Sequence, residues 1–339
     1  MSIEVHKNLS EIFEIGLLIH MHYHPHKISR NTYMQQLSEI GVNGESFSDK
    51  IVPLSSNYLK YFENHFVKTS KDNFFYGDDE WYFLMRLINL IIENDNWLMD
   101  FDDIEDTVVY EKISYKFFDN IPSNISEVLK LLSEENIIPE LCWKITLLFK
   151  NPKELISDFI ESITSNIPAF NYAIDKLKDS TKTLFDDFEV TPHDFVLNFV
   201  KKFDPNIDNN IRLIPTMILC GSIMSFEGGS NDIYFGLFFQ EIYEEMILRR
   251  DFEIDIIPAL KILGDRSKFE ILLFLTKAPN INLEIAKHLE LSAATTSHHM
   301  SVLLSQNLVT VIKENKKANY HVNKQCLKEI IDSLSKLLI

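Results

Sequence analysis

One short segment near the C-terminus gathers side chains that suit recognition of a nucleic acid. Residues 293–305 have the apolar spacing of a helix, and Ser292 is a suitable N-cap because its hydroxyl can accept a backbone N–H. This spacing turns Thr296, Met300 and Leu303 inward and leaves small and polar side chains on the other face: Ala293, Ala294, Ser297, His298 and Ser301. Small side chains let a backbone approach closely, and hydroxyl and imidazole groups can hydrogen bond to base edges and phosphates.

The elements expected around this helix form an arrangement that can insert it into the major groove of DNA. A compact helix over 282–289 precedes it across a tight turn, which is the helix-turn-helix arrangement. After it, residues 308–313 and 318–322 alternate like two strands joined by a polar turn that carries Lys316 and Lys317, so this wing can neutralise phosphates. Helices over 256–263, 267–276 and 324–338 complete the module. The predicted DNA contacts are Ser292, Ala293, Ala294, Thr295, Ser297, His298, His299, Lys313, Lys316, Lys317 and Asn319. A structural role within the module is an equal alternative for His299.

These stretches resemble the winged helix-turn-helix of ArsR-family bacterial transcriptional regulators. The matching segments are LKILGDRSKFEIL (260–272), LEIAKHL (283–289), LSAATTSHHMSVL (291–303) and LVTVIKENKKANYHV (308–322). Four positions depart from the family pattern: Arg266 replaces a frequent Pro, Lys268 a frequent Arg, Met300 the usual Leu, and Asn307 the usual Gly. Asn307 is a mild change because Asn tolerates left-handed backbone.

The resemblance implies binding to double-stranded DNA as a homodimer that reads two half-sites about one helical turn apart. The family's metal sensors use Cys-x-Cys in the helix before the recognition helix, or Asp and His in the last helix. Here residues 282–289 contain no Cys and 324–338 no His, so the resemblance does not imply metal sensing by this module.

The charge is divided unevenly along the chain. Residues 1–251 contain 22 Lys and Arg against 41 Asp and Glu, a net charge of −19, whereas residues 252–339 contain 11 against 9, a net charge of +2. Only the second segment is suited to approach a polyanion. We call residues 1–251 the body and residues 252–339 the C-terminal module.

Amphipathic helical periodicity dominates the body. It recurs at 9–22, 79–94, 124–133, 138–149, 153–163, 168–187, 191–203 and 238–250, while 211–219 and 233–239 are short apolar runs that indicate a β-hairpin or two short strands. We therefore predict a mainly α protein. Its N-terminal helical domain, 1–251, would hold a small β-hairpin within 211–239 and serve in signal sensing or dimerisation. A winged helix-turn-helix domain of α+β type, 252–339, would follow.

Composition argues against several other classes. Only 9 of 339 residues are Gly, about 3% against a usual share of roughly 7%, so Gly-rich phosphate loops are not favoured. No apolar run approaches the roughly 20 residues of a membrane span, and the first residues do not have the order of a signal peptide. The three Cys residues are far apart in sequence, which favours reduced thiols. We expect a cytoplasmic protein without a cofactor, and no enzyme motif is present.

The histidines at 20, 22, 24 and 26 form a second notable cluster. His20 and His24, or His22 and His26, have the i, i+4 spacing with which two imidazoles could bind zinc or nickel. Pro25 interrupts the helix there and no Cys accompanies the cluster, so we favour a helix end with exposed histidines over a metal site.

Two functions remain in consideration. The leading one is a sequence-specific DNA-binding regulator, a repressor, whose body responds to a small-molecule or peptide effector. The alternative is an interaction or assembly protein that uses its winged helix for protein contacts or dimerisation, which the modest charge of the C-terminal module would suit.

Overall fold

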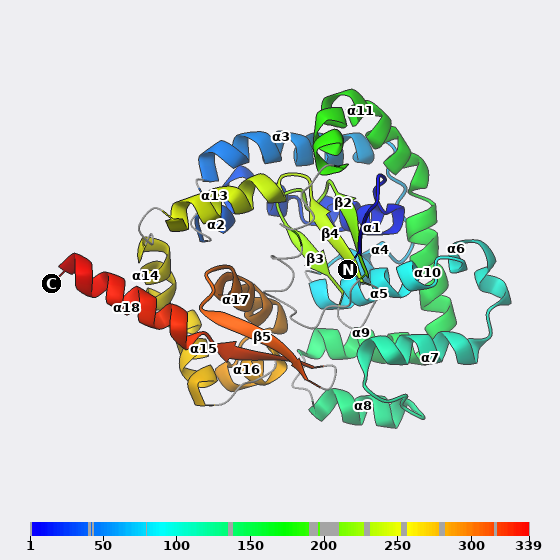
Figure 1. The fold of residues 1–339 in the computed structure, drawn as a ribbon. Helices are drawn as coiled ribbons and strands as arrows, with labels where there is room; N and C mark the ends of the chain where they lie inside the picture. The colour runs from blue at the N-terminus through cyan, green and yellow to red at the C-terminus, as the bar shows by residue number, and fades with distance from the viewer. Residues whose placement is uncertain are drawn as a thin grey trace.

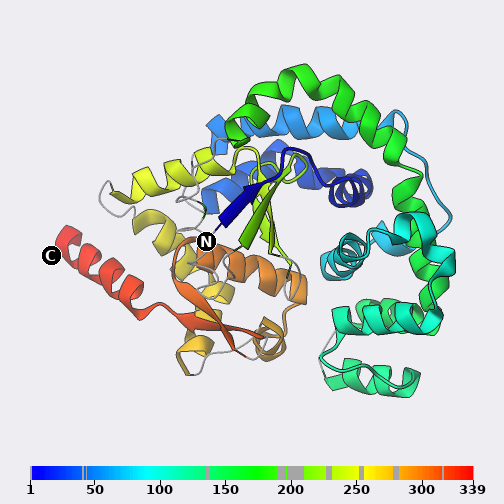
Figure 2. The ribbon, with the colours of Figure 1, turned by 45° about the vertical axis from the view of Figure 1, so that its right-hand side comes forward.

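Helices form most of the structure, as predicted. The computed structural model describes residues 2–39, 42, 44–78, 80–134, 138–189, 196, 210–226, 231–251, 256–277, 282–314 and 317–338. Helices of the body form an arc around a small sheet, and the C-terminal module lies on the open side of that arc (Figures 1 and 2). Among the described residues, no helix has the length and apolar character needed to cross a membrane.

Most body helices follow the predicted periodicity. The expected helices are α1 (Glu11–Tyr23), α5 (Trp81–Glu93), α8 (Ile125–Glu134), α9 (Pro139–Lys150), α10 (Pro152–Thr164), α11 (Ile167–Glu189) and α13 (Phe239–Asp251). The sequence did not indicate α2 (Arg30–Glu39), α3 (Gly44–Glu63), α4 (Asp72–Tyr76), α6 (Trp97–Asp100) or α7 (Asp106–Phe117). The helix expected over 191–203 lies outside the described residues, except for residue 196.

Helix α1 is the central helix of the body. Its residues from Ile12 to Met21 are all buried, including the polar Glu14 and His20. A Cβ atom on Gly16 would lie 2.7 Å from the Ile88 side chain, so glycine permits the close approach of α1 to α5. Burial on every side explains why α1 is apolar around most of its circumference.

A four-stranded sheet packs beside these helices. Its strands are β1 (Ser2–Val5), β2 (Asn210–Thr216), β3 (Ile223–Ser225) and β4 (Asp232–Gly236), in the order β1-β2-β4-β3. A hairpin is present within 211–239, but β3 and β4 form it. The two apolar runs predicted from sequence, now β2 and β4, pair in parallel instead, because the intervening β3 occupies the antiparallel place beside β4.

Glu14 connects α1 to the end of β2. Its carboxylate accepts hydrogen bonds from the backbone N–H groups of Met217, at 3.0 Å, and Ile218, at 3.1 Å. Burial raises the pKa of Glu14 from 4.5 to about 7, although hydrogen bonds from Thr216 and Met217 favour its charged form. A buried acid therefore holds the sheet against the central helix.

The C-terminal module has the element order predicted for a winged helix-turn-helix. It contains α14 (Ile256–Gly264), α15 (Arg266–Lys277), α16 (Asn282–Leu289), α17 (Ala293–Ser305), β5 (Val309–Glu314), β6 (Lys317–Val322) and α18 (Lys324–Leu338). Its buried apolar residues, among them Ile271, Ile285 and Leu303, form a cluster of their own. The module thus builds its own core beside the larger one of the body.

Candidate nucleic-acid interface

Helices α16 and α17 form the predicted helix-turn-helix. Ile285 of α16 packs with Met300 and Leu303 of α17 in the core of the module, and all three are buried. Glu290 adopts left-handed backbone with a φ of 56°, and the N–H of Leu291 donates to the carbonyl of Ala286 at 3.0 Å. This tight turn fixes the angle at which α17 leaves α16.

Ser292 caps α17 as predicted. Its Oγ accepts a hydrogen bond from the backbone N–H of Thr295 at 3.0 Å, and its carbonyl accepts one from the N–H of Thr296 at 2.9 Å. The side chain of Thr296 is buried beneath this turn. The N-terminal end of a helix carries partial positive charge, so this end of α17 suits contact with a phosphate.

The outward face of α17 carries the polar residues that the sequence placed there. The side chains of Thr295, Ser297, His298 and Ser301 are exposed, and Ala293 is half-buried. Of Ala294 only the backbone is described. Asn282 of α16 donates a hydrogen bond to Ser297 Oγ at 3.4 Å, which orients this hydroxyl. These side chains form the recognition face, which we define as Thr295, Ser297, His298 and Ser301.

His299 lies one helical turn after Thr295, at the border of the recognition face. It is half-buried and close enough to Asp265 for positive charge on its ring to lower the pKa of that carboxyl. Burial opposes ionisation of Asp265, but hydrogen bonds from the N–H and Nζ of Lys268, at 3.0 and 3.2 Å, together with nearby positive charge, lower its pKa. Both the structural role of His299 and its contact with DNA stay predictions.

The wing consists of β5 and β6, which pair antiparallel with Lys313 opposite Ala318 and Ile312 opposite Asn319. Asn307, just before the wing, has a φ of 55°, which is the left-handed backbone expected for it. Asn319 is half-buried, and Lys313 and Lys317 are described only by their backbone. Lys316 lies outside the described residues, so the predicted phosphate contacts of this turn stay predictions.

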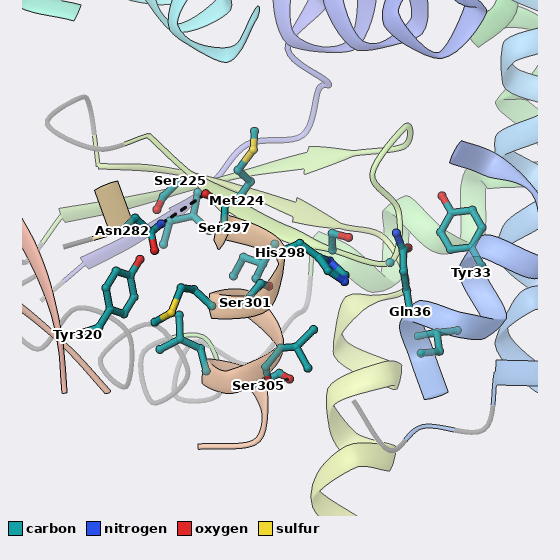
Figure 3. A pocket seen from close by; sticks show the side chains of 18 of the residues that line it. Tyr33, Gln36, Met224, Ser225, Asn282, Ser297, His298, Ser301, Ser305 and Tyr320 are labelled. Atoms are coloured by element: carbon teal, nitrogen blue, oxygen red, sulfur yellow. Dashed lines mark hydrogen bonds between the residues drawn. The ribbon is translucent and has the colours of Figure 1, made fainter. Parts of the chain in front are cut away.

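The recognition face borders a cleft whose opposite wall belongs to the body. This recognition cleft has a volume of about 560 Å³ and is lined by residues of α2, α3, β3, β4 and α17, with contributions from α16 and β6. Figure 3 shows His298 extending toward the side of the cleft where Tyr33 and Gln36 lie, while Ser297 lies near Ser225. Sequence reasoning gave no sign of this cleft, because its walls come from segments up to about 290 residues apart.

The histidines at 20, 22, 24 and 26 have different surroundings. His20 is buried, contrary to the exposed helix end that the sequence favoured, and its ring lies 4.6 Å from that of His24. His24 Nε2 lies 2.8 Å from the carbonyl oxygen of Tyr76, whereas His22 Nδ1 lies 2.8 Å from Glu63 Oε1. Within the described part of the chain, no three potential metal-binding side chains converge.

Comparison with known proteins agrees with this geometry. A family model for bacterial regulatory proteins of the arsR family matches residues 265–311, which run from α15 to the first half of β5. The arsenical resistance operon repressor of Staphylococcus aureus is 38% identical over 76 residues, which are 22% of this chain and 73% of that relative. The chain belongs to the ArsR family.

A second relative gives a similar match. The arsenical resistance operon repressor of Staphylococcus xylosus is 36% identical to this ArsR-family protein over 75 residues, which are 22% of this chain and 72% of that relative. No solved structure gives a significant match. Family membership identifies the protein as a DNA-binding transcriptional regulator, and the family model lies entirely within the C-terminal module.

Proposed function

We propose that this ArsR-family protein is a cytoplasmic, sequence-specific repressor that binds a two-fold symmetric DNA site as a homodimer. The observation that carries the proposal is the recognition face: exposed hydroxyl and imidazole groups at the start of a capped helix, within a helix-turn-helix. Such groups can hydrogen bond to base edges in a major groove. The two relatives are named repressors, which supports the direction of regulation.

An apolar surface on the C-terminal module supports the dimer. Leu260 of α14, Phe269 and Leu273 of α15, and Ile331 of α18 are between 39% and 61% exposed. Phe269 and Leu273 share one face of α15, and α14 contacts both α15 and α18. A second copy of the chain would cover these side chains and set the spacing of the two recognition helices.

The dimer is tested by sedimentation velocity. Phe269→Lys with Leu273→Lys places two charges on the apolar surface, and we expect the dimer to become a monomer with weaker DNA binding. Val108→Lys with Tyr115→Lys is the control, because it adds the same charges at exposed apolar positions of the body. A dimer that persists in the first variant would argue against this interface.

The body is the proposed receiver of a small-molecule or peptide signal. Helix α16, which corresponds to the helix that carries Cys-x-Cys in the family's metal sensors, contains no cysteine, so we assign the signal to another part of the chain. An effector that alters the position of the two recognition helices would change DNA affinity by a coupling free energy of about 1–3 kcal/mol.

Selection of genomic DNA fragments by the purified protein tests the function directly. We expect recovery of a two-fold symmetric sequence that the protein binds more weakly as salt rises. Replacing Lys316 and Lys317 by Ala should weaken binding and reduce the slope of log K against log salt by up to about 2.

The control replaces the exposed Lys178 and Lys182 of α11 by Ala, which removes the same charge outside the C-terminal module. We expect this control to keep the wild-type slope within about 0.5. Failure to enrich any sequence would overturn the proposed function and favour the assembly protein.

A further inference from the structure

The recognition cleft places a wall of the body opposite the residues that would read DNA. Ser297, His298 and Ser301 line one side, while Gln36 of α2 and Ser225 of β3 line the other (Figure 3). Helix α17 also contacts α5 of the body, and α14 contacts α2. In this arrangement the body faces the recognition face across a small, partly open cleft.

This volume is too small for a DNA duplex. A recognition helix enters a major groove about 12 Å wide, with the duplex continuing on both sides of it. The cleft measures about 560 Å³, which is within the range of roughly 300–1,000 Å³ for small-molecule sites. DNA and the body therefore compete for the same face of α17, and the acidic body, with a net charge of −19, adds electrostatic repulsion.

The lining of the cleft defines the chemistry of a ligand. Among its described lining residues there is no Asp, Glu, Lys or Arg, so a charged ligand would lack a permanently charged partner, and the imidazole of His298 is the one described side chain there that can gain a positive charge. Hydrogen-bonding groups are provided by Tyr33, Gln36, Ser222, Ser225, Asn282, Ser297, Ser301, Ser305 and Tyr320. Ile223, Met224, Met300 and Leu304 supply apolar surface.

Asn282 provides a further indication of a ligand. Its Nδ2 donates to Ser297 Oγ, but its Oδ1 is buried without a hydrogen-bond partner among the described residues. A buried carbonyl oxygen left without a donor is unfavourable, because it has lost its hydrogen bonds to water. A donor group on a ligand in the cleft would remove this cost.

We propose that the recognition cleft binds an uncharged small molecule that carries hydroxyl or amide groups on an apolar frame, and that this ligand and DNA exclude each other. The ligand bridges α17 and the body, so it stabilises the closed arrangement and releases DNA. This inference rests on the proposed function and adds the location of the effector, its chemical class and the sign of its effect.

Cross-linking tests whether the closed arrangement excludes DNA. Gln36→Cys and Ser305→Cys place thiols on opposite walls, outside the recognition face, in a chain that also carries Cys142→Ser and Cys326→Ser. A short bismaleimide should join the two thiols, and the joined protein should bind its DNA site at least 100-fold more weakly. The variant with Ser305→Cys alone, treated with the same reagent, should keep its affinity.

Two other outcomes of the cross-linking experiment contradict a proposal. Absence of the cross-link, or a cross-linked protein that binds DNA normally, would overturn the exclusion. If the untreated variant and the wild type both fail to select any DNA, the proposed function fails instead, and the two failures are thereby distinguished.

A matched set of probes tests the ligand class. Benzyl alcohol, benzoate and benzylammonium share one ring and differ in charge, and their binding to the full chain can be followed by saturation-transfer NMR. We expect benzyl alcohol to bind at millimolar concentrations, as befits so small a ligand, and to weaken DNA binding by at least threefold, while the two ions do neither.

A substitution in the cleft locates the probe. Ser225→Trp fills the cleft from an exposed position of β3 and should abolish the benzyl alcohol signal, whereas Ser133→Trp, at an exposed position of α8, should not. Equal binding of the ions, no binding of benzyl alcohol, or a signal that survives Ser225→Trp would overturn the proposed site.

Discussion

The body and the C-terminal module use polar side chains in opposite ways. In the body, buried Asp72 accepts hydrogen bonds from the N–H of Thr69 at 3.0 Å and from Ser162 Oγ at 2.8 Å, and buried Lys144 pairs with Asp78. In the module, the polar residues of the recognition face are exposed. Polar groups inside the body fix one helix against another, whereas those of the module are available to a partner.

The largest expected difference between the two regions comes from one glycine in each of them. A Cβ on Gly236, at the end of β4, would lie 2.4 Å from the carbonyl oxygen of Leu219, whereas a Cβ on Gly264, at the end of α14, would meet nothing within 4 Å. We expect Gly236→Ala to destabilise the body by more than about 3 kcal/mol or to prevent folding. Gly264→Ala should change stability by less than about 1 kcal/mol.

Chemical denaturation of both variants measures the difference. A Gly236→Ala protein as stable as the wild type would show that the turn after β2 can move away from β4. The close packing of β4 against this turn would then not be essential to the stability of the body.

Glu14 gives the body a pH dependence of its own. Its folded pKa of about 7 lies above the unfolded value of 4.5, so the folded chain binds the extra proton between these values. The stabilisation is fully present below about pH 4.5 and is lost as pH rises through 7, by up to roughly 3 kcal/mol. Urea denaturation between pH 5 and 8 should show this fall, and Glu14→Gln should flatten it.

The matched control for this change is Glu11→Gln, at an exposed position of the same helix. It should leave the slope of stability against pH as in the wild type. An identical slope in the Glu14→Gln protein would mean that Glu14 does not titrate in this range.

A negative charge added to the recognition face should weaken DNA binding without changing the fold. Ser297 is exposed, so Ser297→Glu should leave the thermal midpoint unchanged, yet it places a negative charge against DNA. We expect about a 100-fold loss of affinity in fluorescence anisotropy titrations. Ser133→Glu adds the same charge at an exposed position of α8, outside the recognition face and the apolar surface of the module, and should cost less than about threefold.

The smallest expected effect concerns the cap of α17. Ser292→Ala removes the acceptor for the Thr295 N–H and should destabilise the module by about 1 kcal/mol, whereas Ser292→Gly should cost only a few tenths. Thermal unfolding of the two variants measures this difference. Equal stability of both variants and the wild type would show that solvent replaces the hydroxyl as acceptor.

The sequence predicted the C-terminal module well because its signals are local. A cap at Ser292, apolar spacing through Met300 and an Asn able to adopt left-handed backbone at 307 each act within a few residues. The same holds for α1 and α10, whose apolar periodicity survives in the structure. Local signals of this kind fix the type of an element more firmly than its partners.

The elements that the sequence did not reveal depend on contacts between residues far apart in the chain. Strand β1 has only four residues, and it is ordered by parallel pairing with Asn210–Leu213, far along the chain. Helix α3 contains Pro53, which argues against a helix locally, yet buried contacts through Ile51 and Tyr58 maintain it. The recognition cleft joins α2, β3 and α17, so no spacing in the sequence could reveal it.

The parallel pairing of β1 with β2 also constrains the order of events during synthesis. Ser2 pairs with Asn210. About 200 further residues must therefore be translated after β1 before its partner strand exists. At translation rates of roughly 5–20 residues per second, that interval is about 10–40 s. During this interval β1 has no partner strand, and β2, with which it pairs, is translated before the helices α16 and α17.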